Sequence, residues 1–324
     1  MTTVKLTTND RTPQAQKAYL KMTPGGTGAW NDVQFRVNDD CRECDWWVVL
    51  EDLPREETVT CPPGHTVFVT GEPATVMRYP DAFLRQFATV ITSQGRIKHP
   101  DVRHMPTGHI WRPEKNYDEL KKIDTVPKTK LLSIITSNKS LTSGHIKRLA
   151  FCKRLKEHFS DRADLVGRGI NDFADKWDVL APYKYSIAIE NSVEPDYVTE
   201  KLTDCFTALT FPFYYGAPNV SDYYSRDAYE PIDINDFEGS VATIEQILAD
   251  ESHYDEHRAA LVAAKSSYLN ELSLFPLIAK LVEQESRMTA NVPKETSIRP
   301  RNAFAASTLL DRLKKRLYNA ILPL

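Results

Sequence analysis

The sequence predicts an α/β protein with two domains that contain parallel sheets. Residues 183–219 have the pattern strand, loop, helix, strand and turn, which is a βαβ unit. Two runs, WWVVL at 46–50 and TVFVT at 66–70, are almost wholly apolar or β-branched, as is typical of strands buried on both faces. The chain has 324 residues, which is enough for two domains of ordinary size.

The composition is that of an ordinary globular protein, with 41% hydrophobic and 26% charged residues. The formal net charge is −3, which does not favour non-specific binding of nucleic acid. An anionic ligand would therefore need local basic residues. No apolar run is long enough to cross a bilayer, and the first ten residues, MTTVKLTTND, lack the apolar segment of a signal peptide.

Residues 1–126 are expected to form the first domain. The polar, proline-containing sequence up to about residue 30 indicates one short strand followed by a loop. The elements expected in this domain, in chain order, are a strand near 4–6, the two buried strands, a helix at 80–87, a strand at 90–92, a histidine-rich loop at 99–111 and a linker at 118–126. The histidines of that loop either line a cleft that binds the substrate or have only a structural role, in packing and capping.

Residues 127–295 are expected to form the second domain, followed by a separate segment at 296–324. The expected strands are at 130–136, 164–170, 185–189, 211–215 and 229–234. The expected helices are at 145–159, at about 196–209, and at 240–248, 253–266 and 275–287. Strands that alternate with helices favour a parallel sheet.

Glu72 follows the second buried strand, between a glycine that frees the backbone and a proline that fixes it. A carboxylate in this position would lie at the rim of a cleft. It either accepts a proton from a substrate hydroxyl as a general base or caps the helix that follows. The position alone favours neither.

Basic residues gather at the start of the helix expected at 145–159, where Lys139, Lys147 and Arg148 would attract an anion. Arg148 is the first candidate for a phosphate contact, because a guanidinium binds phosphate oxygens in pairs and keeps its proton near neutral pH. Lys147, one helix position away, is an alternative contact. Arg148 could also be a solvated residue paired with an acid.

The βαβ unit suggests a ligand site of its own. Pro195 and Asp196 break the chain after the first strand, and Asp196 is the expected N-cap of the helix. A helix N-terminus at the carboxyl end of a parallel strand favours phosphate. Glu200 and Lys201 lie in this first turn. Considered alone, the pair is better described as a surface ion pair.

The five cysteines are scattered and odd in number, which argues against a disulfide framework. Cys41, Cys44, Cys61 and His65 have a spacing that could complete a zinc site. Reduced thiols, some of them buried, are the favoured interpretation.

Three short runs, ENS at 190–192, DYVTEK at 196–201 and YYGAPN at 214–219, closely resemble the signature of glycosyltransferase family 10, the α-1,3/4-fucosyltransferases. The signature is long and ordered, so it is far more specific than a lone glycine motif. The resemblance is firm for about residues 130–219 and looser for 48–111. It is absent from the first forty residues and the tail.

The resemblance implies a GT-B architecture, in which two Rossmann-like domains face each other across a cleft. The first domain would bind the acceptor and the second the donor. It also implies an inverting transfer of fucose from GDP-fucose to a hydroxyl of a glycan acceptor, of the α-1,3-fucosyltransferase type. Animal members carry a membrane anchor and a stem, whereas this chain shows neither, so we expect a cytoplasmic enzyme of the bacterial type.

The matched positions imply roles for six residues. Glu72 is expected to be the catalytic base, and the expected donor-binding residues are Arg148, Asn191, Tyr197, Glu200 and Lys201. The cations would stabilise the departing diphosphate. No cofactor is expected, because Asp39-Asp40 is not a convincing DxD metal motif, although stimulation by a divalent metal stays open.

Residues 304–321 are expected to form a basic amphipathic helix. It would pack across the domains, pair with a partner or lie on the inner membrane surface, and we favour packing. Two alternative functions also stay open: a GT-B transferase for another nucleotide sugar, and a non-catalytic module that binds glycan or a membrane surface. Intact Glu72, Arg148, Glu200 and Lys201 argue against the second alternative.

Overall fold

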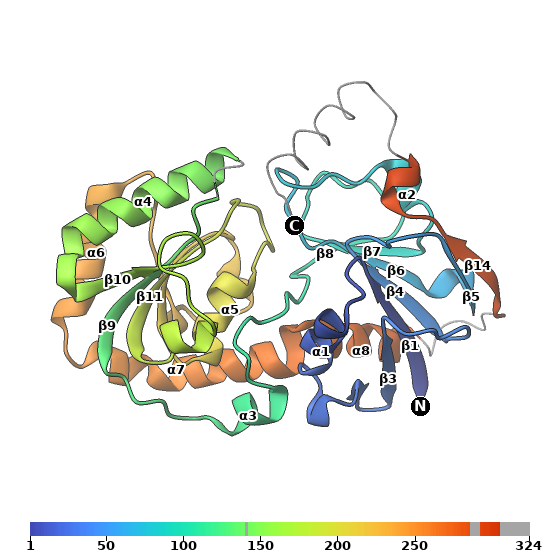
Figure 1. The fold of residues 1–324 in the computed structure, drawn as a ribbon, viewed down its shortest axis with the longest axis horizontal. Helices are drawn as coiled ribbons and strands as arrows, with labels where there is room; N and C mark the ends of the chain where they lie inside the picture. Colours follow the sequence, from blue (N-terminus) through green and yellow to red (C-terminus); the bar gives the residue numbers. More distant parts are fainter. Residues whose placement is uncertain (140–141, 286–291, 305–324) are drawn as a thin grey trace.

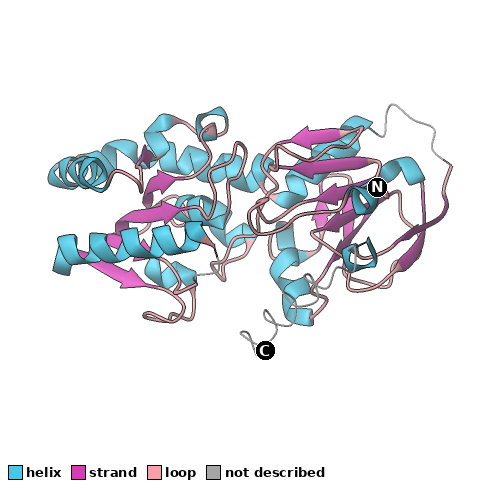
Figure 2. Ribbon diagram, turned by 90° about the horizontal axis from the view of Figure 1, so that it is seen from above, coloured by secondary structure: helices cyan, strands magenta, loops and turns pink. Residues whose placement is uncertain are grey.

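The computed structural model describes residues 1–139, 142–285 and 292–304. Two largely parallel sheets lie in separate halves of the molecule (Figure 1), and helices flank both of them (Figure 2). The first sheet has seven strands and the second has five. The expected α/β class with two parallel sheets is therefore confirmed.

The seven-stranded sheet belongs to the N-terminal half and has the order β2-β3-β1-β4-β6-β7-β8. Its strands are β1 (Thr2–Thr8), β2 (Ala29–Trp30), β3 (Val33–Val37), β4 (Trp46–Leu50), β6 (Thr66–Val69), β7 (Thr89–Thr92) and β8 (Val102–His104). In β4, Trp46 and Val48 pack into one buried cluster, whereas Trp47 and Val49 pack into another. Successive side chains point to opposite faces of a strand, so this run is apolar throughout because both faces are covered.

The five-stranded sheet belongs to the C-terminal half, is parallel throughout and has the order β10-β9-β11-β12-β13. Its strands are β9 (Lys130–Ile135), β10 (Ala163–Val166), β11 (Tyr183–Ile189), β12 (Phe211–Tyr215) and β13 (Glu230–Pro231). The expected βαβ unit is β11, α5 (Glu200–Thr207) and β12. Because the strands are parallel, their carboxyl ends meet at one edge, where α/β proteins bind ligands.

The other helices are α1 (Pro13–Leu20), α2 (Asp81–Leu84), α3 (Tyr117–Lys122), α4 (Ser143–Phe159), α6 (Phe237–Ala249), α7 (His253–Ser267) and α8 (Leu274–Glu285). Within the described ranges, none of the helices combines the length and the apolar character that a bilayer crossing requires.

The chain returns to the N-terminal sheet after α7. In α8, the ring of Phe275 meets that of Phe35 at 4.9 Å between centroids. Strand β14 (Lys294–Ile298) then pairs antiparallel with β5 (Glu57–Cys61). The domain limits expected from the sequence stay a prediction, and the helix expected at 304–321 lies outside the described residues except for Phe304.

Some expectations for the N-terminal half were wrong. The segment expected as a loop up to residue 30 contains α1, whose N-cap Thr12 accepts a hydrogen bond from the Ala15 backbone at 3.2 Å. The segment expected as a linker, 118–126, contains most of α3, whose first turn carries a capping box made by Asn116 and Glu119, and its role as the link between the domains stays a prediction. Short helices of this kind depend on caps more than on a long apolar stripe.

The expected start of α5 was also wrong. Its N-cap is Thr199, whereas Asp196 has a left-handed φ of 64° and accepts a 2.7 Å hydrogen bond from the Asn219 side chain.

The strand expected at 164–170 ends at Val166, because Gly167 turns the chain with a φ of 145°. A β-carbon on Gly167 would lie 1.4 Å from the Thr136 carbonyl oxygen, so only glycine fits there.

Candidate active site

A pocket of about 250 Å³ lies between the two halves of the molecule and is lined by residues of both. All six predicted site residues line it: Glu72, Arg148, Asn191, Tyr197, Glu200 and Lys201. Glu72 comes from the N-terminal half and the other five from the C-terminal half. The structure thus brings together residues that are far apart in the sequence, while their individual roles stay predictions.

The start of α5 is fixed by the strand that precedes it. Glu190 follows β11 and is only 2% exposed. Its carboxylate accepts hydrogen bonds from the backbone N–H of Thr199 at 2.8 Å and from the Thr199 hydroxyl at 2.7 Å. Thr199 in turn caps the helix by accepting from the backbone N–H of Lys201 at 3.3 Å. This chain of contacts sets the direction in which the first helical turn faces the pocket.

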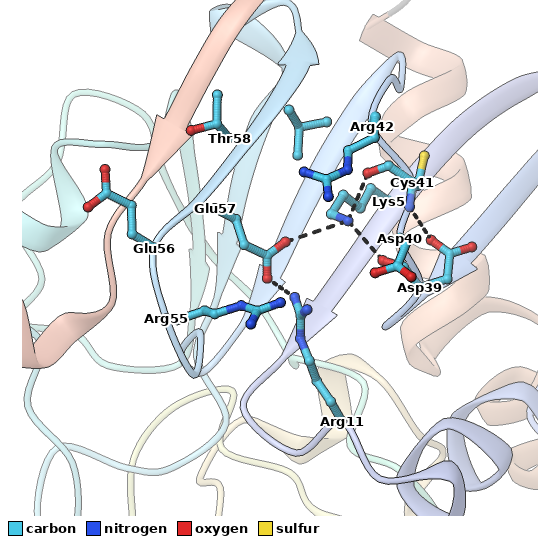
Figure 3. Close-up of a pocket in the computed structure, with 11 residues that line it drawn as sticks. Lys5, Arg11, Asp39, Asp40, Cys41, Arg42, Arg55, Glu56, Glu57 and Thr58 are labelled. Carbon is cyan, nitrogen blue, oxygen red and sulfur yellow. Dashed lines mark hydrogen bonds and ion pairs between the residues drawn. The ribbon is translucent and has the colours of Figure 1, made fainter.

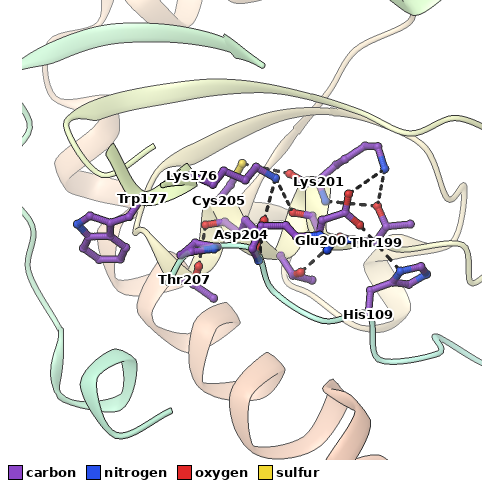
Figure 4. A network of polar contacts seen from close by, with 12 residues as sticks. His109, Lys176, Trp177, Thr199, Glu200, Lys201, Asp204, Cys205 and Thr207 are labelled. Carbon is purple, nitrogen blue, oxygen red and sulfur yellow. Dashed lines mark hydrogen bonds and ion pairs between the residues drawn. The ribbon is translucent and has the colours of Figure 1, made fainter. Parts of the chain in front are cut away.

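Lys201 lies close to two carboxylates, those of Glu200 (Figure 4) and Glu190. Its Nζ is 3.3 Å from Glu200 Oε1 and 3.4 Å from Glu190 Oε2. Burial alone would raise the pKa of Glu200, but the ammonium groups of Lys201 and Lys176 outweigh it and hold this pKa well below its usual range. Burial likewise lowers the pKa of Lys201, whereas Glu200 and Glu190 raise it above its usual value. Both groups are therefore charged at neutral pH.

Arg148 lies in the pocket and is only 5% exposed. Its guanidinium donates to Thr136 Oγ1 at 3.2 Å, to Ser137 Oγ at 3.5 Å and to the side-chain oxygen of Asn191. The neighbouring Lys147 does not line the pocket, and its Nζ donates to Asn235 Oδ1 at 3.3 Å. Of these two candidate anion contacts, the geometry therefore favours Arg148.

Glu72 lies on the opposite wall, in the loop after β6. The side-chain amide of Gln94 donates to the backbone carbonyl oxygen of Glu72 at 2.7 Å and so fixes this loop. Burial raises the pKa of the Glu72 carboxyl, and Lys201 across the pocket lowers it in part. The alternative role as a helix cap was wrong, because α2 begins only after Pro80 and has no side-chain cap.

Seven further residues line the pocket: Glu51, His109, Arg112, Ser137, Lys139, His145 and Thr199. Lys139 had been noted as a local cation, and His109 belongs to the histidine-rich loop for which lining a cleft was one of the two expectations. Glu51 and Ser137 follow parallel strands, so position at a strand end was the signal that could have found them.

A loop of the N-terminal half contacts the start of α5 (Figure 4). His109 Nδ1 lies 3.9 Å from Glu200 Oε2, and the backbone N–H of Arg112 donates to Asp204 Oδ1 at 3.1 Å. Asp204 is 0% exposed and also pairs with Lys176 Nζ at 2.8 Å. Burial lowers the pKa of His109 to about 4, against the opposing effect of Glu200, so this imidazole is neutral at neutral pH.

We expect the free energy of unfolding to fall as the pH is lowered from about 6.5 to about 4. In this window the unfolded chain binds a proton on His109 that the folded protein excludes, so stability rises with pH and is lost with acid. The loss is at most about 3 kcal/mol, from about 1.36 kcal/mol per pKa unit. Urea unfolding at several pH values would measure it. The variant His109→Gln should show a flatter profile, and an unchanged profile would contradict this assignment.

Two other clusters do not form a comparable site. Among the described residues, no group of three or more His, Cys, Asp or Glu side chains is arranged to hold a metal ion, so the zinc arrangement of Cys41, Cys44, Cys61 and His65 is not present. A pocket near Lys5, Arg11 and Glu57 lies entirely within the N-terminal half (Figure 3). There the Glu57 carboxylate pairs with both Lys5, at 3.5 Å, and Arg11.

Comparison with known proteins supports the resemblance. A family model described as glycosyltransferase family 10 (fucosyltransferase) C-term matches residues 125–259. An α-(1,3)-fucosyltransferase B of Drosophila melanogaster is 32% identical over 104 residues, which cover 31% of this chain and 23% of that protein. The α-(1,3)-fucosyltransferase FucT of Helicobacter pylori is 28% identical over 103 residues, which cover 32% and 19%. The matched segments thus span less than a quarter of these relatives.

The structural likeness extends over both halves. A solved α1,3-fucosyltransferase crystallised with GDP superposes with a TM-score of 0.52 and 14% sequence identity. The alignment covers 85% of this chain and 92% of that protein. At this identity the likeness shows the fold alone. It confirms the expected GT-B architecture, with two α/β domains facing each other across the pocket.

Proposed function

We propose that this chain, whose residues 125–259 match the model of glycosyltransferase family 10, is an inverting α-1,3-fucosyltransferase that moves fucose from GDP-fucose to a glycan hydroxyl. One observation carries the proposal. Cationic groups and a helix N-terminus on one wall of the pocket face the Glu72 carboxylate on the other wall. Such an arrangement suits a reaction in which a diphosphate departs and a hydroxyl attacks.

The donor diphosphate would bind beside Lys201 and Arg148. Negative charge grows on the β-phosphate as the bond to fucose breaks, and preorganised cations stabilise this charge without reorganisation. The N-terminus of α5 adds backbone N–H groups and the positive end of the helix dipole. We propose that these groups suffice without a required metal cofactor. The solved relative that carries GDP supports this choice of nucleotide.

The sugar and nucleoside would contact Asn191, Tyr197 and Glu200. The Glu200 carboxylate stays ionised and can only accept hydrogen bonds, so it suits sugar hydroxyl groups. The guanidinium of Arg148 holds the side-chain oxygen of Asn191 and so orients its amide. Tyr197 is 2% exposed and forms part of the pocket wall.

Glu72 would act on the acceptor. Its carboxylate takes the proton of the acceptor hydroxyl as the new bond from oxygen to the anomeric carbon forms. The bond between that carbon and the phosphate oxygen breaks, and its electron pair leaves with GDP. Attack on the face opposite the leaving group inverts the anomeric configuration. The raised pKa of Glu72 suits this role, because it makes the carboxylate a stronger base.

Isothermal titration with GDP, UDP and CMP tests the proposal first. We expect GDP to bind at least about tenfold more tightly than the other two, which corresponds to about 1.4 kcal/mol. Preference for UDP or CMP would favour a transferase for another nucleotide sugar. Absence of binding by all three would favour the non-catalytic module.

A transfer assay with GDP-fucose and a panel of glycan acceptors then tests the reaction. The acceptor should accelerate release of GDP well above the slow hydrolysis of GDP-fucose by water, and the product should carry fucose with inverted configuration. A cytoplasmic location, and contact of residues 304–321 with the inner membrane surface, are further parts of the proposal.

A further inference from the structure

Glu51 lines the pocket but has no role in the function proposed so far. It directly follows β4, and its backbone N–H donates to the Val69 carbonyl oxygen at 2.9 Å. Its φ is 67°, in the left-handed region that residues with a β-carbon seldom adopt. Strained backbone of this kind clusters at ligand sites, where it aims a side chain. The strain is therefore a reason to ask what the Glu51 side chain does.

Gly71 makes room for the carboxyl of Glu51. A β-carbon at position 71 would lie 1.9 Å from Glu51 Oε1 and 2.7 Å from Glu51 Cδ. The carboxyl group thus lies against bare backbone, one residue before the proposed base Glu72. Any side chain at position 71 would displace it.

The carboxyl group of Glu51 has no protein partner among the described residues, since neither a hydrogen bond nor an ion pair to it is found there. Two comparable acids do have partners: the partly buried Glu57 pairs with Lys5 and Arg11, and the buried Glu190 accepts from Thr199. Burial and, after it, the charge of Glu72 raise the pKa of Glu51. The carboxyl group is only partly buried and faces the pocket, so a ligand bound there would supply the hydrogen-bond partner that the protein does not.

A second cavity, of about 250 Å³, meets the catalytic pocket at Glu51. Glu51, His109 and Arg112 line both cavities, and α1 closes the second one with Ala15, Ala18 and Tyr19. A larger cavity, of about 570 Å³, includes Gln94 and Glu194 but shares no lining residue with the catalytic pocket. The space continuous with the reacting centre therefore lies on the side of Glu51 and α1.

We propose that Glu51 binds the acceptor, by a hydrogen bond to a hydroxyl of the sugar ring that carries the reacting hydroxyl, and that this ring lies in the second cavity. The inference rests on the proposed function. It names the ligand as a sugar ring with a second free hydroxyl, because a carboxyl group can exchange hydrogen bonds with a hydroxyl. An acceptor in which this second hydroxyl is removed or methylated would leave Glu51 without its hydrogen-bond partner.

The test compares Glu51→Ala, Glu51→Gln and wild type. We expect Glu51→Ala to raise the acceptor KM about tenfold or more, the effect of losing one good hydrogen bond in a closed site. The Kd for GDP and the slow hydrolysis of GDP-fucose by water should both stay within about twofold. Glu51→Gln should recover part of the acceptor affinity, because an amide still forms hydrogen bonds.

Two further variants separate this role from a structural one. Glu57→Gln removes a partly buried carboxylate of the same half of the molecule that does not line the catalytic pocket, and it should leave the acceptor KM unchanged. Gly71→Ala keeps Glu51 but displaces its carboxyl, so it should raise the acceptor KM as Glu51→Ala does. Thermal unfolding of each variant checks folding.

An unchanged acceptor KM in Glu51→Ala would overturn the inference, as would an equal loss of GDP binding. If the wild-type enzyme binds GDP and transfers fucose, either of these results for Glu51→Ala would leave the proposed function standing. A wild-type protein that binds no nucleotide would instead refute the proposed function itself.

Discussion

Replacing Lys201 with alanine is expected to weaken GDP binding by about one to two orders of magnitude. Hydrogen bonds to charged groups contribute about 1.5–3 kcal/mol, and this ammonium is the cation that stands in the first turn of α5. Its loss also leaves Glu190 and Glu200 without their shared counter-charge, which adds repulsion toward a diphosphate. Isothermal titration with GDP measures the effect directly.

Lys147→Ala is the matched control for this variant. It removes an equal charge from the neighbouring helix α4, but Lys147 contacts Asn235 and does not line the pocket. GDP binding by Lys147→Ala should therefore stay within about twofold of wild type, because salt screens the Lys147 charge from a ligand in the pocket. Thermal unfolding would show whether Lys201→Ala remains folded. A folded Lys201→Ala protein with wild-type GDP affinity would refute the proposed donor site.

The parts of the fold that the sequence predicted are those with strong local patterns. Trp46–Leu50 is apolar at every position, because its two faces meet two different buried clusters. The βαβ unit around α5 combines a strand, a chain break and an apolar helical face within forty residues. In such segments local propensity and tertiary packing favour the same structure.

The parts that the sequence did not predict depend on caps or on distant partners. Helices α1 and α3 are short, and their capping residues Thr12 and Asn116 were not recognised. Strand β14 pairs with β5, although the whole C-terminal half separates them in the sequence. Asp196 looked like a helix cap after Pro195, but Asn219 and Tyr223 bind its carboxylate and Thr199 takes the cap.

The candidate site shows the same division. The motif placed Asn191, Tyr197, Glu200 and Lys201 together because they surround one helix start. Glu51 was missed, and His109 was expected only as one of several loop histidines that could line a cleft, since both come from the other half of the molecule. Figure 4 shows how such a loop brings His109 beside Glu200. A motif within one βαβ unit cannot report residues that the facing domain contributes.

Replacing Glu72 with alanine or glutamine is expected to lower the rate of fucose transfer by about 10²- to 10⁴-fold, the usual contribution of a general base. GDP binding should stay near normal, because Glu72 lies on the wall opposite Lys201 and Arg148. In the wild-type enzyme, kcat/KM should fall as the pH drops through the raised pKa of Glu72, since a protonated carboxyl cannot accept the hydroxyl proton. Glu72→Gln, which cannot titrate, should lose this acidic limb.

The two measurements together isolate the chemical step. A variant that binds GDP like wild type but does not transfer fucose has lost a group that acts on the acceptor. Glu57→Gln again serves as the control, because the Glu57 carboxylate pairs with Lys5 and Arg11 (Figure 3) and does not line the catalytic pocket. Near-normal transfer by Glu72→Ala would show that another group removes the proton. Glu51 would then be the first residue to test, because it is the other unpartnered carboxyl on that wall among the described residues.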